Sequence, residues 1–432
     1  MKDYKFSTFV HSYPYDGNII LLHTLSQRII IITKENYNLI EKNRNEIGLL
    51  ATIKPSLFSM LNKLGYIVDA NYEEMNEVLV RYNSAIFNTS LYRMTILPTL
   101  DCNFKCWYCY EKRRNKKVMS AIILNRVKKY ASNIIENTGI KHFALDWFGG
   151  EPLIGFEKVV HPLSVHVIDK AQKHNVAFSS SITTNGYLIR EEWLPIFNEI
   201  QLRNFQITLD GDEKAHNKVK TSKDAYKRTI QNINLICENV KNITVMLRFN
   251  YTDDKLHTIK TVVDDIPKKN RHLIIISLQK VWQYKSIKNN FDVNIKDIYD
   301  FFRDEGFLTD SYHPQYVASC YADKKEQAVI NYDGLVFKCT ARDYVKSNSD
   351  GFLNSEGIIE WNQEKLNKRL ATRRFHYEKC TKCNLLPMCY GPCSQKVLEV
   401  PVTKFTQICN YQGLELSLNE FLEKKYHEMM KK

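Results

Sequence analysis

The stretch Cys102-Asn-Phe-Lys-Cys106-Trp-Tyr-Cys109 decides how this sequence is interpreted. It directly follows the apolar run Met94 to Leu97, which has the length and composition of a buried strand. Three thiolates are therefore presented together at the end of one strand. Because an iron–sulfur cluster takes about four protein ligands, three sulfurs leave one iron open to another ligand. Two other interpretations are a zinc site without its fourth ligand and three unrelated core cysteines.

Strand-like runs alternate with helical patterns on both sides of this stretch, from Arg93 to about Trp282. The predicted strands span Met94 to Leu97, His142 to Trp147, Ala177 to Thr183, Asn204 to Leu209, Ile243 to Phe249 and Leu273 to Leu278. The predicted helices span Ala121 to Glu136, Lys158 to Lys173, Glu191 to Ile200, Asp224 to Val240 and Lys255 to Asp265. Six β-α repeats predict a parallel sheet, closed or partly closed as a barrel, with functional loops at the carboxyl ends of its strands.

The C-x3-C-x2-C spacing, with Tyr108 before its third cysteine, resembles the radical SAM superfamily. Further segments follow in the family's order. Gly149-Gly150-Glu151-Pro152 is similar to the GGEP motif, whose glycines let the backbone approach the amino end of S-adenosylmethionine. A tight strand-to-helix turn is the alternative for that segment alone. Several later residues also resemble positions that lie around the cofactor and substrate in this family: Ser181, Asn185, Thr208, Asp210, His216 and Arg248. The Arg248 guanidinium could pair with a carboxylate.

The resemblance implies an α/β fold with a partial (β/α)6 barrel over residues 91–310. Its catalytic cysteines Cys102, Cys106 and Cys109 would hold a [4Fe–4S] cluster whose open iron is chelated by S-adenosylmethionine. An electron from a donor such as flavodoxin or ferredoxin would then yield a 5′-deoxyadenosyl radical that abstracts hydrogen. The cofactor-binding residues implied by the resemblance are Tyr108, Gly149, Gly150, Glu151, Pro152, Ser181, Asn185, Thr208, Asp210 and Arg248.

Seven further cysteines crowd the last quarter of the chain: Cys320, Cys339, Cys380, Cys383, Cys389, Cys393 and Cys409. Their spacing matches the SPASM signature of radical SAM enzymes that modify peptides and proteins. That resemblance implies a cysteine-rich SPASM domain over residues 311–432 with two auxiliary [4Fe–4S] clusters and a C-terminal helix. Taken alone, four of these cysteines would also suit one tetrahedral zinc ion: Cys380, Cys383, Cys389 and Cys393.

The same resemblance divides the ligands between a distal and a barrel-proximal cluster. The distal set is Cys380, Cys383, Cys389 and Cys409, and the proximal set is Cys320, Cys339 and Cys393. Some family members have an eighth cysteine shortly before the first, but Pro314 stands in that region here and His313 is the nearest soft ligand. We therefore expect an open or non-cysteine site on the proximal cluster. A substrate thiolate could bind there and be joined to a carbon radical as a thioether, while the cluster takes up the surplus electron.

Residues 1–90 are predicted to form a separate winged-helix-like domain. Extended runs flank the hairpin signal Asp16-Gly17, and helical patterns follow up to Gly65. The module resembles leader-recognition domains fused to maturases of ribosomally made peptides, in which a sheet edge adds a strand from the precursor. Nucleic-acid binding and a purely structural cap are alternatives. The predicted third helix offers only Lys63 and the flanking Lys54 as basic groups, which argues against nucleic acid.

Composition excludes several classes of protein. A hydrophobic fraction of 44% and a charged fraction of 25% are typical of globular proteins and exclude disorder. The net charge of +13 suits an acidic peptide, a nucleic acid or an anionic surface, or simply reflects a solvated lysine-rich surface. No membrane span or secretory signal is predicted, so we expect a cytoplasmic protein. Its 11 cysteines then favour metal binding over disulfides, with Cys237 as a helical core residue.

These features predict a cytoplasmic radical SAM/SPASM maturase that captures the leader of a precursor peptide and forms a thioether. Carbon–carbon crosslinking, epimerisation and oxidation stay open. One alternative is an anaerobic sulfatase-maturating enzyme, which oxidises Cys or Ser to formylglycine. Two features argue against this alternative. Such enzymes resemble a radical SAM barrel followed by a SPASM domain, without a domain before the barrel. They also carry an acidic residue directly after the cysteine equivalent to Cys339, where this sequence has Thr340. A non-catalytic iron–sulfur protein for electron transfer is the alternative from another class.

Overall fold

The computed structural model describes residues 3–111, 116–281, 295–310, 320–372, 375, 377–401, 403–404, 408–409 and 411–431. His313 and Pro314, named above for the proximal cluster, lie outside the described residues. The chain divides into two compact units. The larger comprises Thr89–Ser311 and Glu326–Leu366, and the smaller comprises Met1–Asn88, Tyr312–Lys325 and Asn367–Lys432.

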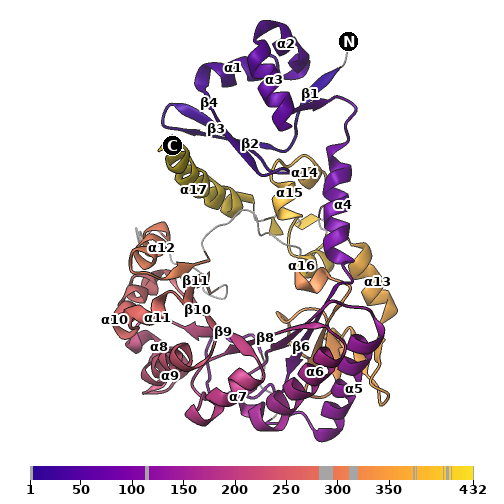
Figure 1. The fold of residues 1–432 in the computed structure, drawn as a ribbon, viewed down its shortest axis with the longest axis vertical. Helices are drawn as coiled ribbons and strands as arrows, with labels where there is room; N and C mark the ends of the chain where they lie inside the picture. The colour runs from indigo at the N-terminus through magenta and orange to yellow at the C-terminus, as the bar shows by residue number, and fades with distance from the viewer. Residues whose placement is uncertain are drawn as a thin grey trace. The chain divides into compact units, whose positions relative to one another are not determined.

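All six predicted parallel strands form in the larger unit (Figure 1). They are β6 (Leu91–Leu97), β7 (His142–Trp147), β8 (Ala177–Thr184), β9 (Leu202–Leu209), β10 (Thr244–Tyr251) and β11 (Ile274–Lys280). Each pairs in parallel with its neighbour along the chain, in the order β11-β10-β9-β8-β7-β6. Because β6 and β11 are not neighbours in the described sheet, the β-α barrel is partial.

The sheet extends beyond the six strands that the sequence predicts. The two-residue β12 (Leu308–Thr309) lies beside β11, and β13 (Gln327–Asn331) pairs in parallel with β6. An antiparallel extension follows from β13 through β14 (Leu335–Phe337), β15 (Gly351–Leu353) and β16 (Ile359–Trp361). Residues from the cysteine-rich last quarter of the chain therefore continue the sheet beyond β6, the first strand of the barrel.

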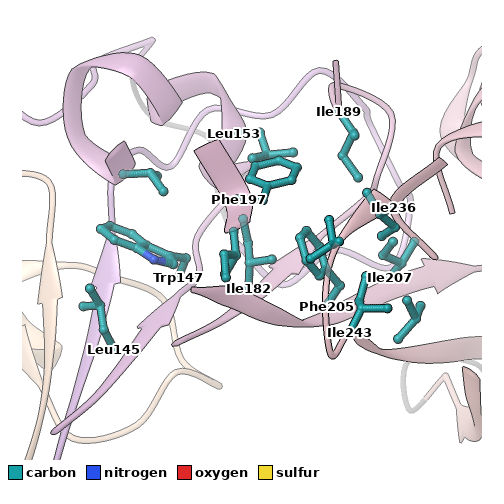
Figure 2. Packing of buried hydrophobic residues seen from close by; sticks show 14 of the residues in the cluster. Leu145, Trp147, Leu153, Ile182, Ile189, Phe197, Phe205, Ile207, Ile236 and Ile243 are labelled. Carbon is teal, nitrogen blue, oxygen red and sulfur yellow. The ribbon is translucent and has the colours of Figure 1, made fainter. Parts of the chain in front are cut away.

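Helices and strands of the larger unit share one apolar core. Figure 2 shows Trp147, Ile182 and Phe205, from three neighbouring strands, together with Phe197 and Ile236 from helices. Alternate residues of a strand point to opposite faces, so polar residues on these strands lie on the other face of the sheet. The helices are α5 (Ala121–Asn137), α6 (His161–Lys173), α7 (Leu194–Glu199), α8 (Glu213–Lys220), α9 (Ala225–Asn239), α10 (Val262–Asp265), α11 (Lys268–Arg271) and α12 (Ile295–Asp304). Short helical turns are η2 (Pro152–Gly155), η3 (Phe156–Val160), η4 (Glu191–Trp193), η5 (Asp253–Thr261) and η8 (Lys346–Asn348).

The smaller unit begins with the predicted hairpin, and Asp16 and Gly17 have φ of 48° and 73°, as its two-residue turn requires. The strands β2 (Val10–Tyr15), β3 (Asn18–His23) and β4 (Arg28–Thr33) form an antiparallel sheet, and β1 (Tyr4–Phe6) pairs with β5 (Ile67–Asp69). The helical segments are α1 (Lys34–Lys42), η1 (Arg44–Leu49), α2 (Leu50–Ile53), α3 (Pro55–Leu64) and α4 (Glu74–Ile86). This order of strands and helices agrees with the sequence pattern, and the winged-helix assignment stays a prediction.

The cysteine-rich segment packs on the same sheet. Leu21 of β3 faces a core with α1 to α3, whereas Ile20 and Leu22 face Leu418 and Leu422 of α17 (Tyr411–Met430). The Tyr13 hydroxyl also donates to Glu423 (2.6 Å). The other helices of this segment are η7 (Tyr321–Asp323), α13 (Gln363–Ala371), α14 (Glu378–Thr381), α15 (Leu386–Cys389) and α16 (Ser394–Glu399). The segments predicted as N- and C-terminal domains therefore share hydrophobic cores in one compact unit.

Within the described ranges, the structure contains no helix with the length and apolar character needed to cross a membrane.

Candidate active site

The three cysteines that follow β6 line a single pocket, with about 720 Å³ of space that is partly open to solvent. The lining residues are Leu100, Cys102, Phe104, Cys106, Tyr108, Cys109, Glu111, Phe148, Gly149, Gly150, Thr183, Thr184, Asn185, Thr208, Lys220 and Asn250. The carboxyl ends of five parallel strands, β6 to β10, or the segments that follow them, thus meet at one edge of the sheet, where such folds place their functional sites.

In the described part of the chain, no three His, Cys, Asp or Glu side chains converge closely enough for a single metal ion. Cys102, Cys106 and Cys109 supply three sulfurs on the wall of a pocket that is partly open to solvent. These residues fit a [4Fe–4S] cluster with one iron open to S-adenosylmethionine.

Gly149 and Gly150 bring the loop after β7 against the backbone that leads to Cys102. A Cβ on Gly150 would lie 2.2 Å from the Asp101 carbonyl oxygen, and one on Gly149 would lie 2.4 Å from that of Thr99. The close approach also allows the Gly150 N–H to donate to the Thr99 carbonyl (3.2 Å). The physical requirement for glycine here is backbone contact with the cysteine loop, in addition to the expected approach to the cofactor.

Glu151 joins the loops after β7 and β8. Its fully buried carboxylate accepts hydrogen bonds from the Asn185 N–H (2.8 Å), the Thr184 hydroxyl (2.8 Å) and the Leu153 N–H (3.0 Å). Burial raises the pKa of this carboxyl, and these hydrogen bonds oppose the rise. The Asn185 side-chain amide, held nearby, donates to Cys102 Sγ (3.8 Å). Glu151 therefore orients a residue that lines the pocket, but it is not itself a lining residue.

A buried ionic cluster lies behind the second cysteine. The Lys220 ammonium donates to Cys106 Sγ (3.6 Å) and lies 3.2 Å from Asp210 Oδ2. The same carboxylate oxygen is 3.2 Å from His216 Nδ1, and Asp210 Oδ1 accepts from the Tyr108 hydroxyl (2.5 Å). Burial favours the neutral acid, but the Lys220 charge and the interactions with His216 and Tyr108 together outweigh it and lower the pKa of Asp210 to about 2. Asp210 is therefore an anion that ties Tyr108 to Lys220.

Two other predicted contacts, Arg248 and Ser181, lie at different positions. Arg248 Nε donates to Asn250 Oδ1 (3.0 Å), and the Asn250 amide in turn donates to the Tyr108 hydroxyl (3.1 Å). Ser181 donates to Asp146 (2.6 Å), deeper along β8. The predicted residues that line the pocket are Tyr108, Gly149, Gly150, Asn185 and Thr208, and those that do not are Glu151, Pro152, Ser181, Asp210 and Arg248.

Sequence reasoning missed Lys220 and Asn250. Lys220 stands four residues after His216, so the two share a face of α8, and this spacing was the available signal. Asn250 stands two residues after Arg248 on β10 and therefore points to the same side of the sheet.

The C-terminal cysteines belong to different units. Cys320, Cys380, Cys383, Cys389, Cys393 and Cys409 fall in the smaller unit, and Cys339 falls in the larger one. Burial, followed by the charges of Cys409, Cys389 and Cys383, raises the pKa of Cys380 to about 12. The Cys380 thiol is therefore electrostatically coupled to each of the other three. Cys237 is buried in the apolar core, where burial raises its pKa to about 12.

Residues 96–262 match the family model described as the radical SAM superfamily. A cysteine-type anaerobic sulfatase-maturating enzyme from Clostridium novyi is 24% identical over 341 residues, which cover 69% of this chain and 87% of the relative. A serine-type enzyme from Bacteroides thetaiotaomicron is 29% identical over 168 residues, 35% of this chain and 38% of the relative.

Solved structures resemble the fold over most of the chain. The structure named native anSMEcpe with bound AdoMet has a TM-score of 0.55 at 18% identity and covers 78% of this chain and 98% of its own. Streptococcus suis SuiB bound to precursor peptide SuiA has a TM-score of 0.52 at 15% identity and covers 94% of this chain and 100% of its own. The likeness to SuiB thus includes more of the present chain than the likeness to anSMEcpe.

Proposed function

We propose that this chain, whose residues 96–262 match the radical SAM superfamily, is an enzyme that uses S-adenosylmethionine and a [4Fe–4S] cluster to mature a ribosomally made precursor peptide. One observation carries the proposal: the three cysteines line a single pocket together with the glycine loop and Asn185. The structural likeness over 94% of the chain to SuiB, solved with its precursor peptide, supports a peptide as the substrate.

In this proposal Cys102, Cys106 and Cys109 hold the cluster, which together with S-adenosylmethionine supplies a hydrogen-abstracting 5′-deoxyadenosyl radical. The residues proposed to touch the cofactor are those predicted contacts that line the pocket: Tyr108, Gly149, Gly150, Asn185 and Thr208. The others act through them: Glu151 orients Asn185, Asp210 orients Tyr108, and Arg248 acts through Asn250. Pro152 begins the helical turn after the glycines, and Ser181 fixes Asp146. A donor such as flavodoxin or ferredoxin supplies the electron.

The C-terminal cysteines form two auxiliary cluster sites in this proposal. The distal set is Cys380, Cys383, Cys389 and Cys409, supported by the electrostatic coupling of Cys380 to the other three. The proximal set is Cys320, Cys339 and Cys393, which has three sulfurs and leaves an iron for a substrate thiolate. Such a site supports thioether formation as the outcome.

The leader of the precursor adds to β4 in this proposal. β3 pairs on both sides, whereas β2 and β4 each pair with β3 alone among the described strands. Pro14 removes a backbone donor from β2, but β4 retains a donor at every residue. The β4 isoleucines also contact cores on both faces, Ile30 and Ile32 on one and Ile29 and Ile31 on the other. A rigid edge with unpaired donors is the surface that β-strand addition uses.

The proposal is tested with anaerobically reconstituted enzyme, dithionite and the precursor peptide. We expect cleavage of S-adenosylmethionine to 5′-deoxyadenosine and loss of two hydrogens from the peptide by mass spectrometry. Cys106→Ala should abolish both, and Cys237→Ala, which removes a core thiol, should retain both. An unchanged peptide in the presence of 5′-deoxyadenosine formation would contradict peptide crosslinking. Hydrogen exchange should show protection of β4 and not β2 when leader peptide is added.

Sulfatase maturation is the second candidate, because the Clostridium novyi enzyme aligns over 87% of its length. Thr340 in place of an acidic residue and the sheet that precedes the barrel favour the first candidate. Formylglycine produced in a sulfatase-derived Cys or Ser peptide would support this second function.

A further inference from the structure

We infer that Lys220 is a positioning residue that raises the reduction potential of the barrel cluster through its hydrogen bond to Cys106 Sγ. This inference deepens the proposed function and rests on its assignment of Cys106 as a cluster ligand. Lys220 is the last residue of α8, is only 4% exposed and lines the pocket with the three cysteines. A buried ammonium is costly unless neighbouring groups compensate its charge.

The local fold aims this ammonium at the sulfur. Asp212 caps α8 by accepting from the Ala215 N–H (2.8 Å), and left-handed Thr221 ends the helix directly after Lys220. His216, one turn earlier, lies 3.2 Å from the same Asp210 oxygen as Lys220. The carboxylate therefore holds the ammonium from one side, and Cys106 accepts from it at 3.6 Å.

The contact favours the reduced cluster. One-electron reduction adds one negative charge to a cluster and its thiolates, and a hydrogen-bond donor to a ligand sulfur stabilises the more negative state. The negative charge of Asp210 would lower the reduction potential and so opposes this effect. Part of that charge is balanced by the hydrogen bond that Asp210 Oδ1 accepts from the Tyr108 hydroxyl. Lys220 is the cation in direct contact with the ligand sulfur, so the net effect of its removal is a lower potential.

The experiment is a redox titration of reconstituted holoenzyme followed by electron paramagnetic resonance. The barrel signal is identified as the one absent from the Cys102→Ala/Cys106→Ala/Cys109→Ala variant. In Lys220→Met we expect the reduced-to-oxidised ratio at a given potential to fall about tenfold, which is about 59 mV for one electron. Lys220→Arg, which keeps a charged donor, should stay near the wild-type midpoint. Lys218→Met removes an exposed lysine from the same helix and should leave the midpoint unchanged.

An unchanged midpoint in Lys220→Met with wild-type iron content would overturn the inference while leaving the proposed function intact. If that variant loses its iron, Lys220→Leu, which also lacks a donor to Cys106 Sγ, is titrated instead, and a wild-type midpoint there has the same consequence. Failure of the wild-type chain to assemble iron at the barrel cysteines overturns the proposed function and this inference together.

Discussion

Gly150→Ala tests whether the glycine loop holds the cysteine loop in place. The added Cβ would lie 2.2 Å from the Asp101 carbonyl oxygen and 2.6 Å from that of Leu100. Both atoms are backbone, so no side chain can rotate away, and the segment leading to Cys102 must move. Overpacking of this kind costs about 1–3 kcal/mol. The substitution adds no backbone strain of its own, because Gly150 does not have a positive φ.

Gly139→Ala is the matched control. Gly139 has a φ of +71° and nothing within 4 Å of its added Cβ, so the variant loses about 1–2 kcal/mol through backbone strain alone. Thermal unfolding should therefore show comparable destabilisation in the two variants. Only Gly150→Ala should lose iron from the barrel site and at least about tenfold in 5′-deoxyadenosine formation, a change that corresponds to about 1.4 kcal/mol. Wild-type iron content and cleavage in Gly150→Ala would refute the reasoning.

The remaining predictions concern three buried residues, Asp210, Glu151 and Cys237. Asp210→Asn leaves the Lys220 ammonium without its counter-ion and should lower the free energy of unfolding by about 3–5 kcal/mol, measured by denaturant titration. The double variant Asp210→Asn/Lys220→Met removes both charges and should restore most of this loss. The depressed pKa of Asp210 means that its stabilisation is present above pH 3.8 and is lost as pH falls to about 2, so this part of the acid dependence should vanish in Asp210→Asn. The pH dependence that Glu151 contributes runs in the opposite direction. Because its pKa is raised in the folded protein, stability should fall as pH rises from 4.5 through the folded pKa. Glu151→Gln should remove this part of the pH dependence of stability. Cys237→Ala should cost about 1 kcal/mol and leave iron content unchanged, whereas loss of iron would contradict its place in the core.

The barrel strands were predictable because each is a short apolar run bounded by turn residues. His142–Trp147 forms over the predicted residues, and the other five differ only at their ends. Helix starts were harder to predict: the pattern from Lys158 predicts one helix, but a turn over Phe156–Val160 precedes α6 at His161. Both segments bury the same apolar side, so periodicity alone does not separate them.

The strand β13 was not predicted, although all five of its residues are buried. Its apolar run resembles any short core segment, and only its partner β6, more than two hundred residues earlier in the chain, makes it a strand of the barrel sheet. The shared cores of the smaller unit have the same origin. Ile20 and Leu22 of β3 contact α17, which lies near the other end of the chain.

The sequence by itself determined the cysteine spacing, the β-α order and the glycine loop, because these depend on neighbours within a few residues and on the carboxyl-end rule for parallel strands. Only the tertiary structure decided that Glu151 orients Asn185, that Lys220 donates to Cys106, and that the first and last segments share a core. These contacts join residues that are far apart in the chain. Such residues meet only after the helices and strands have packed, when the burial and direction of each side chain are fixed.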